Sequence, residues 1–506
     1  MVFPGGMQKL DDWINPIAVK EIRQAVKGKF ISATLLFFLT CQLVIIGSVL
    51  VLSESVGEDF ETGRSLFTAL LAVLLVTCVF LLPSYAFLRF ASEHSDSHVD
   101  LFFITTLRPH QIIWGKMMAL LALVFLFFSA SIPFLTFTFL LRGLDLQSVF
   151  ILLGFDFLMI VGCIQFAILL ACFRGNFMSR AFCFFVGFGA FSVVFSIVMQ
   201  ASFGMLYFGI GSSLGTWDFW GPALTVTVFL LMSIGFIFIL SVTAITPSSA
   251  NRALPVRIYM IVMWLTSGII AYIWTHMTHA EDILQTWVLA MVCVFGTLML
   301  VSLSERFELG PRVRRVIPKN MLLRVPAFLL YSGAGSGIIF AFMMIAASVL
   351  FVAVAFKLLG LNSNSGLWLV HYPLTSSFLA APALALYVFC YSLTALTIKR
   401  VFFSKVARPG LTTFIAVILM LIGSTVPFII GYLINPDPWY NLSSRWYIGN
   451  PGIIFFDEDS CLESFIFTWI WGMGCFAVTL PWFVDQARNF KPLIPAQKKM
   501  VEVNNE

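Results

Sequence analysis

The sequence predicts an all-α, polytopic integral membrane protein with about twelve transmembrane helices and both termini in the cytosol. Its composition is the first reason: of 506 residues, 60% are hydrophobic and only 11% are charged, with a mean hydropathy of +0.96. A soluble domain carries roughly 25% charged residues and could not bury so much apolar surface in water. Lipid must therefore surround most of the chain, and helices satisfy the backbone hydrogen bonds that lipid cannot.

Apolar runs that are long enough to cross a bilayer are the second reason. A transmembrane helix needs roughly 20 predominantly apolar residues. The predicted span Ile258–Trp274 is short. The apolar stretch 325–356 allows a helix in the membrane interface before the ninth span crosses the bilayer. The predicted spans are Phe30–Leu52, Ser65–Leu88, Met117–Leu141, Ser148–Cys172, Ala181–Gly209, Gly221–Ile245, Ile258–Trp274, Ile283–Ser304, Gly335–Phe356, Leu374–Ile398, Leu411–Ile434 and Ser464–Phe483.

The positive residues divide unevenly between the two sides of the predicted membrane. If all twelve runs cross, only four of the 30 Lys and Arg residues lie on one side: Arg64, Arg142, Lys357 and Arg445. Cytosolic loops carry the excess of Lys and Arg. The side that holds the other 26, with both termini, is therefore predicted to be cytosolic. A missed helix would scramble this alternation, so the division also supports the number of helices.

The composition argues against several other classes of protein. The nine cysteines show no CxxC or paired spacing, so neither a disulfide framework nor a zinc site is predicted. The first apolar run exceeds the 7–15 residues of a signal-peptide core, so no cleavable signal peptide is expected. The net charge of +5 is small, and no nucleic-acid partner is expected. No HExxH motif and no cluster of His and Asp residues suited to catalysis is present, so the chain is not predicted to be an enzyme.

The N-terminal segment 15–27 predicts a short amphipathic helix. Asn15 is a favourable N-cap, and Pro16 a favourable first helical residue. Such a helix lies in the membrane interface with its basic edge toward the headgroups. The plainer alternative is a helix that only anchors the chain. The apolar face would hold Val19, Ile22, Val26 and Phe30, and the basic edge Lys20, Arg23 and Lys27.

The loop between the second and third predicted spans, residues 91–116, predicts a second amphipathic helix. Ser97 can cap a helix that starts at His98, and Asp100 favours the positive end of that helix. Pro109 would end it, and a second short helix would lead through Gly115 into the membrane. An amphipathic helix on the cytosolic side suits docking to another protein.

Both segments resemble the permease subunits of type-2 ABC transporters. The pairs Asn15-Pro16, Lys20-Glu21 and Arg23-Gln24 are similar to that family's interfacial elbow helix. The loop resembles its coupling-helix pattern and departs from it at Ser97-His98, where Gly-Thr is usual, and at Thr106, where Pro is usual. The resemblance covers roughly 11–245. The loop residues that fit, together with Arg108 between them, are Glu93, Asp100, Leu101, Thr105, Leu107, Pro109, Gly115 and Lys116.

The resemblance implies a transport subunit, an exporter in the inner membrane of a bacterium, whose coupling helix contacts a separate ATP-hydrolysing subunit. It also implies a re-entrant stretch between the fifth and sixth spans. No GxxxxGK[ST] motif occurs, so ATP is expected on the partner and no cofactor on this chain. The glycine-rich stretch Tyr331–Gly337 lacks the lysine of a phosphate loop and predicts close helix packing. Whether a second permease chain joins the complex stays open.

Asp156 is the one acidic residue predicted to lie deep within a span. A carboxylate at the bilayer centre costs on the order of 2.5–3.5 kcal/mol, so it should face the interior of the helix bundle or water. It is either part of a substrate or proton pathway or a packing residue. The alternative functions are a secondary transporter, for which twelve helices are also common, an integral membrane enzyme and a non-catalytic membrane scaffold.

The predicted organisation has four parts. Residues 1–29 form a cytosolic N-terminus with the elbow helix, and residues 30–245 a six-helix permease-like domain. Residues 246–485 form a second membrane region of about six helices, and residues 486–506 a cytosolic tail.

Overall fold

A computed structural model describes residues 15–52, 60–93, 108–140, 145–173, 177–208, 214–247, 250–305, 310–360, 377–403, 410–434, 450–451 and 459–492. All regular secondary structure in these ranges is helical, which confirms the all-α class. Twelve of the described helices are long and apolar enough to cross a membrane, and each coincides with a predicted span. The protein is therefore a multi-pass membrane protein.

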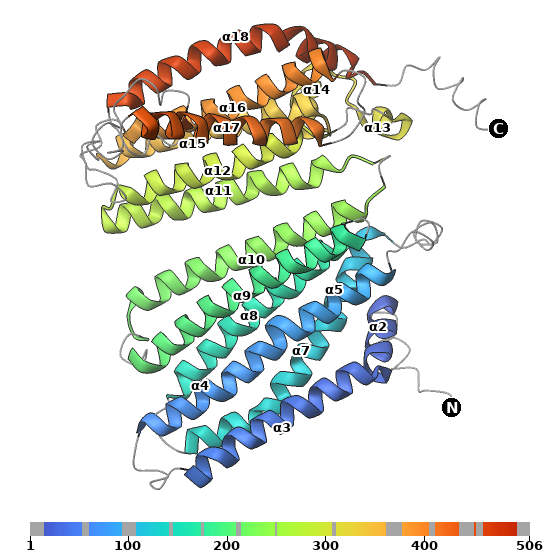
Figure 1. The fold of residues 1–506 in the computed structure, drawn as a ribbon, viewed down its shortest axis with the longest axis vertical. Coiled ribbons are helices and arrows are strands. Elements are labelled where there is room, and N and C mark those ends of the chain that lie inside the picture. The colour runs from blue at the N-terminus through green and yellow to red at the C-terminus, as the bar shows by residue number, and fades with distance from the viewer. Residues whose placement is uncertain are drawn as a thin grey trace, which may run out of the picture. The chain divides into compact units, whose positions relative to one another are not determined.

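The chain divides into two compact units, Met1–Thr246 and Pro247–Glu506, each with six candidate spans (Figure 1). In the first unit, the described helices are α2 (Pro16–Lys27), α3 (Lys29–Leu52), α4 (Phe60–Val76), the π-helical turn η1 (Thr77–Leu81), α5 (Leu82–Glu93), α7 (Pro109–Leu140), α8 (Leu146–Cys172), α9 (Phe177–Phe208) and α10 (Trp217–Ile245).

Helix α8 lies at the centre of the first unit and packs against α5, α7, α9 and α10. Its buried side chains include Ile160, Ile164, Ala167 and Ala171, which recur every three or four residues along one helix face. Small residues among them let neighbouring helices approach closely, as membrane helix packing requires. This packing fixes α5 and α7, which carry the site described below.

The second span is one path made of α4, η1 and α5. Pro83 follows the π-helical turn Thr77–Leu81. Because proline cannot donate a backbone hydrogen bond and its ring crowds the carbonyl of the preceding turn, the helix widens locally instead of breaking. The span therefore continues through α5, which ends at Glu93, directly before the loop 94–107.

One expectation about the first unit is wrong in the described residues. A separate short helix was expected after Pro109, but α7 is one continuous helix from Pro109 to Leu140. Proline at the first helical position has no donor to lose, so it starts the long helix directly. The re-entrant stretch that the resemblance implies between the fifth and sixth spans falls largely on residues 209–213, which lie outside the described part of the chain, and it stays a prediction.

The second unit holds the other six spans and two short helices. Its described helices are α11 (Ala253–Thr278), α12 (Asp282–Ser302), α13 (Pro311–Val316), α14 (Met321–Leu330), α15 (Ala334–Leu359), α16 (Ser377–Phe402), α17 (Leu411–Ile434) and α18 (Asp459–Asn489). Helix α14 is separate from α15, which is the interfacial alternative allowed by the sequence. Its apolar residues Met321 and Leu322 are 77% and 82% exposed, as expected for a helix that lies in lipid.

Candidate functional site at the elbow junction

Helix α2 packs mainly against α7 through a face of small residues and one acid. The Asn15 side chain accepts a hydrogen bond from the Ile17 N–H at 3.1 Å, and Pro16 takes the first helical position, as the sequence predicted. The face toward the protein holds Ala18, Glu21 and Ala25, all buried. Lysine and arginine side chains of α2 are exposed on its other faces. The helix is amphipathic, but its protein-facing side is centred on a carboxylate.

Gly115 of α7 allows α2 to approach closely. A Cβ atom at this position would lie 2.9 Å from both Asn15 Nδ2 and Ile17 Cβ. The Asn15 amide also donates a hydrogen bond to the Gln111 carbonyl at 2.6 Å. Asn15 therefore both caps α2 and ties its start to the first turn of α7. Any larger residue at position 115 would push the two helices apart.

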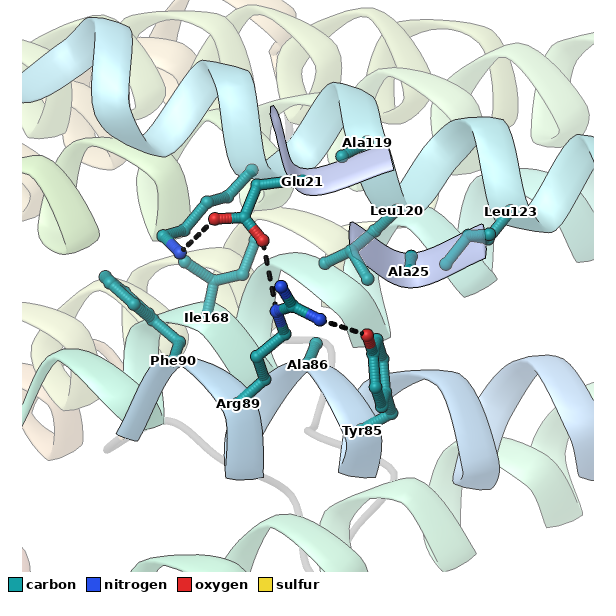
Figure 2. Close-up of a pocket in the computed structure, with 11 residues that line it drawn as sticks. Glu21, Ala25, Tyr85, Ala86, Arg89, Phe90, Ala119, Leu120, Leu123 and Ile168 are labelled. Atoms are coloured by element: carbon teal, nitrogen blue, oxygen red, sulfur yellow. Dashed lines mark hydrogen bonds and ion pairs between the residues drawn. The ribbon is translucent and has the colours of Figure 1, made fainter. Parts of the chain in front are cut away.

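The Glu21 carboxylate pairs with two cations from different helices. Its Oε1 lies 3.0 Å from Lys116 Nζ, and its Oε2 lies 3.2 Å from Arg89 Nε. Figure 2 shows the carboxylate facing Arg89 of α5, with Tyr85 beyond it. The side chains of Glu21 and Lys116 are 9% and 7% exposed. This charged cluster, Glu21 with Arg89 and Lys116, joins α2, α5 and α7.

Neighbouring polar and aromatic groups hold both cations of the cluster. Arg89 donates to the Tyr85 hydroxyl at 2.6 Å and to the Gln24 side-chain oxygen. The Lys116 ammonium lies 4.5 Å from the centre of the Phe90 ring, a favourable cation–π distance. Arg89 therefore binds both Glu21 and Gln24 of the elbow helix, so that α2 is fixed to the end of the second span as well as to the third.

A small cavity adjoins the cluster. Its volume is about 30 Å³, and its lining includes Glu21, Arg89, Lys116 and the apolar residues Leu120 and Ile168. A void of this size holds about one water molecule. The cavity leaves room for little more than solvent, and the charged residues that line it join α2, α5 and α7.

The residues predicted to couple to a partner either flank the loop 94–107 or belong to it, and this loop lies outside the described residues. Glu93 ends α5, Arg108 lies just before α7, and Pro109 starts α7. Gly115 and Lys116 lie inside the junction and contact α2. Four of the predicted coupling residues lie outside the described part of the chain: Asp100, Leu101, Thr105 and Leu107.

Among the elbow residues, Asn15, Glu21 and Gln24 reach the junction, whereas Lys20 and Arg23 are exposed. Sequence reasoning missed Arg89, although an arginine at the end of the second span was visible as an ordinary positive-inside residue. Its pairing with Glu21 joins positions 68 residues apart, which no local spacing predicts.

Asp156 is buried in α8 and faces α9. The Ser202 hydroxyl donates to its Oδ1 at 3.4 Å, and Oδ2 has no hydrogen-bond partner among the described residues. Further along α8, the Oε1 atom of Gln165 is also buried and has no hydrogen-bond partner among the described residues. Asp156 thus lies in the interior of the first unit, as expected for an acid within a span. Its role stays a prediction.

Comparison with protein-family models, curated proteins and solved structures found no match to this chain. Among the described residues, no group of three or more His, Cys, Asp or Glu side chains is placed to hold a metal ion.

Proposed function

We propose that this chain is the membrane-spanning permease subunit of an ATP-driven ABC transporter, with export as the direction of transport. The observation that supports this most directly is the meeting of the two motifs that carry the resemblance. The Asn15–Gln24 motif and the Gly115-Lys116 motif lie about a hundred residues apart, yet they form one buried junction through Glu21 and Lys116.

The junction suits the transmission of motion. The loop 94–107 is flanked by α5, which carries Arg89, and by α7, which carries Lys116. Both cations pair with Glu21 of α2. A partner that displaces this loop would pull on α5 and α7 together, and the cluster would carry α2 with them. Because packed helices shift as rigid elements, a small movement of the loop becomes a movement of whole spans. The loop and both termini lie in the cytosol in this proposal.

The ATP-hydrolysing subunit is a separate chain in this proposal, and this chain binds no nucleotide. Charge reversal in the predicted coupling helix, Asp100→Lys, should remove a co-purifying ATPase that carries Walker A and signature motifs. Charge reversal at Asp218, in the first turn of α10 on the opposite predicted side, is the matched control and should leave the complex intact. Full complex and full ATPase stimulation with Asp100→Lys would defeat the proposal.

The second candidate function is a secondary transporter, and Asp156 is the observation that favours it. A buried carboxylate inside a span is typical of proton- or ion-coupled pathways. If transport into vesicles follows an ion gradient and is indifferent to ATP, this candidate replaces the first.

A further inference from the structure

The interfacial helix α14 of the second unit is held firmly at one end only. It packs against α11 and α15. The residues of its last turn, from Ala327 to Leu330, are all partly buried, whereas Met321, Leu322 and Val325 in its first half are largely exposed. The described part of the chain therefore fixes the end of this helix and leaves its apolar first half uncovered.

A buried ion pair holds the fixed end. The Arg257 guanidinium of α11 donates to the Leu329 and Tyr331 carbonyls, both at 2.7 Å, and pairs with Glu305 at 2.8 Å. Carbonyls at the end of a helix have no partner within it, so Arg257 supplies the donors that they need. Glu305 in turn accepts from the Gly333 N–H at 2.9 Å, just before α15. The pair thus fixes both the end of α14 and the start of α15.

The glycine-rich stretch lets α15 begin close to two other spans. A Cβ at Gly337 would collide with the Ser302 side chain at the end of α12, and a Cβ at Gly335 with the Gln486 side chain of α18. The Gly335 N–H also donates to the Gln486 Oε1 at 3.1 Å. The close packing predicted for Tyr331–Gly337 is confirmed, and it brings the start of α15 against the end of α18.

An apolar cluster joins α13 and α14 to the end of α18. Its buried centre consists of Ile317, Tyr331 and Phe490, and Val313 of α13 and Phe328 of α14 pack against it. The centre of the Phe490 ring lies 5.5 Å from that of Phe328 and 5.2 Å from that of Tyr331, with the rings edge to face. This Phe490 cluster fixes the place of the short helix α13 beside the end of α18.

Four exposed bases surround the Phe490 cluster and form what we call the basic rim. Each lies within two residues of Ile317 or Phe490. Because Ile317 and Phe490 belong to one packed cluster, bases from two distant parts of the chain gather at one place. None of the four makes an ion pair with another described residue. The bases of the rim are Arg315, Lys319, Arg488 and Lys491.

The described residues do not balance the charge of the basic rim. At this end of the second unit, the described acids are Glu305, which pairs with the buried Arg257, and the exposed Asp485, three residues before Arg488. One exposed acid cannot neutralise four exposed bases. An excess of positive charge on one part of a surface attracts an anionic partner.

We propose that the basic rim and the exposed half of α14 bind an anionic phospholipid, with its headgroup against the bases and its acyl chains along α14. The apolar surface begins where the positive charge ends: the exposed Val316 adjoins Arg315, and Met321 follows Lys319 by two residues. Interfacial helices bind membranes through buried apolar area together with the attraction of bases to anionic headgroups. An acidic soluble protein would match the charge and leave the apolar half of α14 uncovered, and a neutral lipid would do the reverse.

A bound anionic lipid holds the half of α14 that the chain leaves uncovered. Arg257 already fixes the last turn, so the lipid leaves the helix held along its whole length. The inference is independent of the proposed function, because an ABC permease and a secondary transporter both lie in a bilayer that can supply such a lipid.

The experiment measures the affinity of the full-length protein in detergent for a fluorescent phosphatidylglycerol, with phosphatidylcholine as the neutral comparison. A base beside an anionic membrane surface contributes a factor of about five in affinity. Arg315→Gln/Lys319→Gln should therefore raise the Kd for phosphatidylglycerol about 25-fold, and Lys319→Arg should leave it unchanged. Lys399→Gln/Arg400→Gln, which removes two bases from α16 at the same end of the unit, is the matched control and should change it less than twofold.

Hydrogen exchange in nanodiscs gives a second measurement. The amides of residues 321–330 should exchange more slowly when phosphatidylglycerol is added to phosphatidylcholine, and Arg315→Gln/Lys319→Gln should remove this protection. These two positions are exposed, so the substitutions should leave the fold intact. Protection of residues 321–330 that does not depend on phosphatidylglycerol would overturn the inference.

Three other results would also overturn it, and none of them bears on the proposed function. Equal affinity for the two lipids would leave a surface that binds lipid without regard to charge. An equal loss of affinity in the α16 variant would leave an effect of positive charge in general. Displacement of the lipid by millimolar inorganic phosphate, or a photo-crosslink from Val316 to a protein in place of lipid, would assign the basic rim to another partner.

Discussion

Replacing Glu21 by glutamine is the sharpest perturbation of the elbow junction. Glutamine keeps the size and shape of the side chain, so it creates no cavity, but it takes the carboxylate away from Lys116 and Arg89. The side chain of Lys116 is only 7% exposed, whereas that of Arg89 is 25% exposed and keeps Tyr85 and Gln24 as hydrogen-bond partners. The cost therefore falls mainly on the lysine.

The expected magnitude follows from burial. Removing one partner of a buried ion pair destabilises by about 3–5 kcal/mol. The amide oxygen that replaces the carboxylate recovers on the order of 1 kcal/mol by accepting a neutral hydrogen bond. We expect Glu21→Gln to cost about 2–4 kcal/mol, and the cost to appear first as release of α2. The double variant Glu21→Gln/Lys116→Met removes both charges and should regain most of the loss.

Hydrogen exchange in detergent or in nanodiscs measures this effect locally. The amides of residues 16–27 should lose protection in Glu21→Gln by the factor that corresponds to the free-energy change, and the double variant should restore it. Amides in α8, away from the junction, serve as the internal reference. A change below about 1 kcal/mol, or equal deprotection throughout the first unit, would refute the view that this cluster holds the elbow helix.

Three further predictions concern other parts of the chain. Gly115→Ala should destabilise the protein by about 1–3 kcal/mol, because the added Cβ would lie 2.9 Å from atoms of α2. Gly154 has open space around it, so Gly154→Ala is the control and should gain only the helix propensity of alanine. Denaturation of the two variants measures the difference. Asp156→Asn should reduce transport in vesicles more than it reduces protein abundance on immunoblots, and equal loss of both would return Asp156 to a packing role. Glu305→Gln should loosen α14, because Glu305 pairs at 2.8 Å with the buried Arg257, which donates to the Leu329 carbonyl at the end of that helix; unchanged hydrogen-exchange protection of residues 321–330 would contradict this.

The membrane fold could be predicted from the sequence because its signal is local. Each span is a continuous apolar run, and the alternation of positive loops checks the runs against one another. The N-cap at Asn15 was likewise visible, since a cap depends on two or three adjacent residues. The interfacial helix before α15 could be foreseen only as an alternative, because an apolar run does not show where it leaves the lipid.

The junctions could not be predicted because they depend on contacts between distant residues. Glu21 looks like one more charge on an amphipathic helix, and Arg89 like an ordinary cytosolic arginine. Only the packing of α2 on α7, which Gly115 permits, brings them together.

The most direct test of the account is the accessibility of a single cysteine introduced at Leu101, measured with a membrane-impermeant thiol reagent in sealed vesicles of both orientations. Modification is expected only in inside-out vesicles, at a rate that falls when the ATPase subunit is bound, because in the proposal this residue lies in the cytosol and docks that subunit. Modification from the outer face, or a rate indifferent to the ATPase, would contradict it.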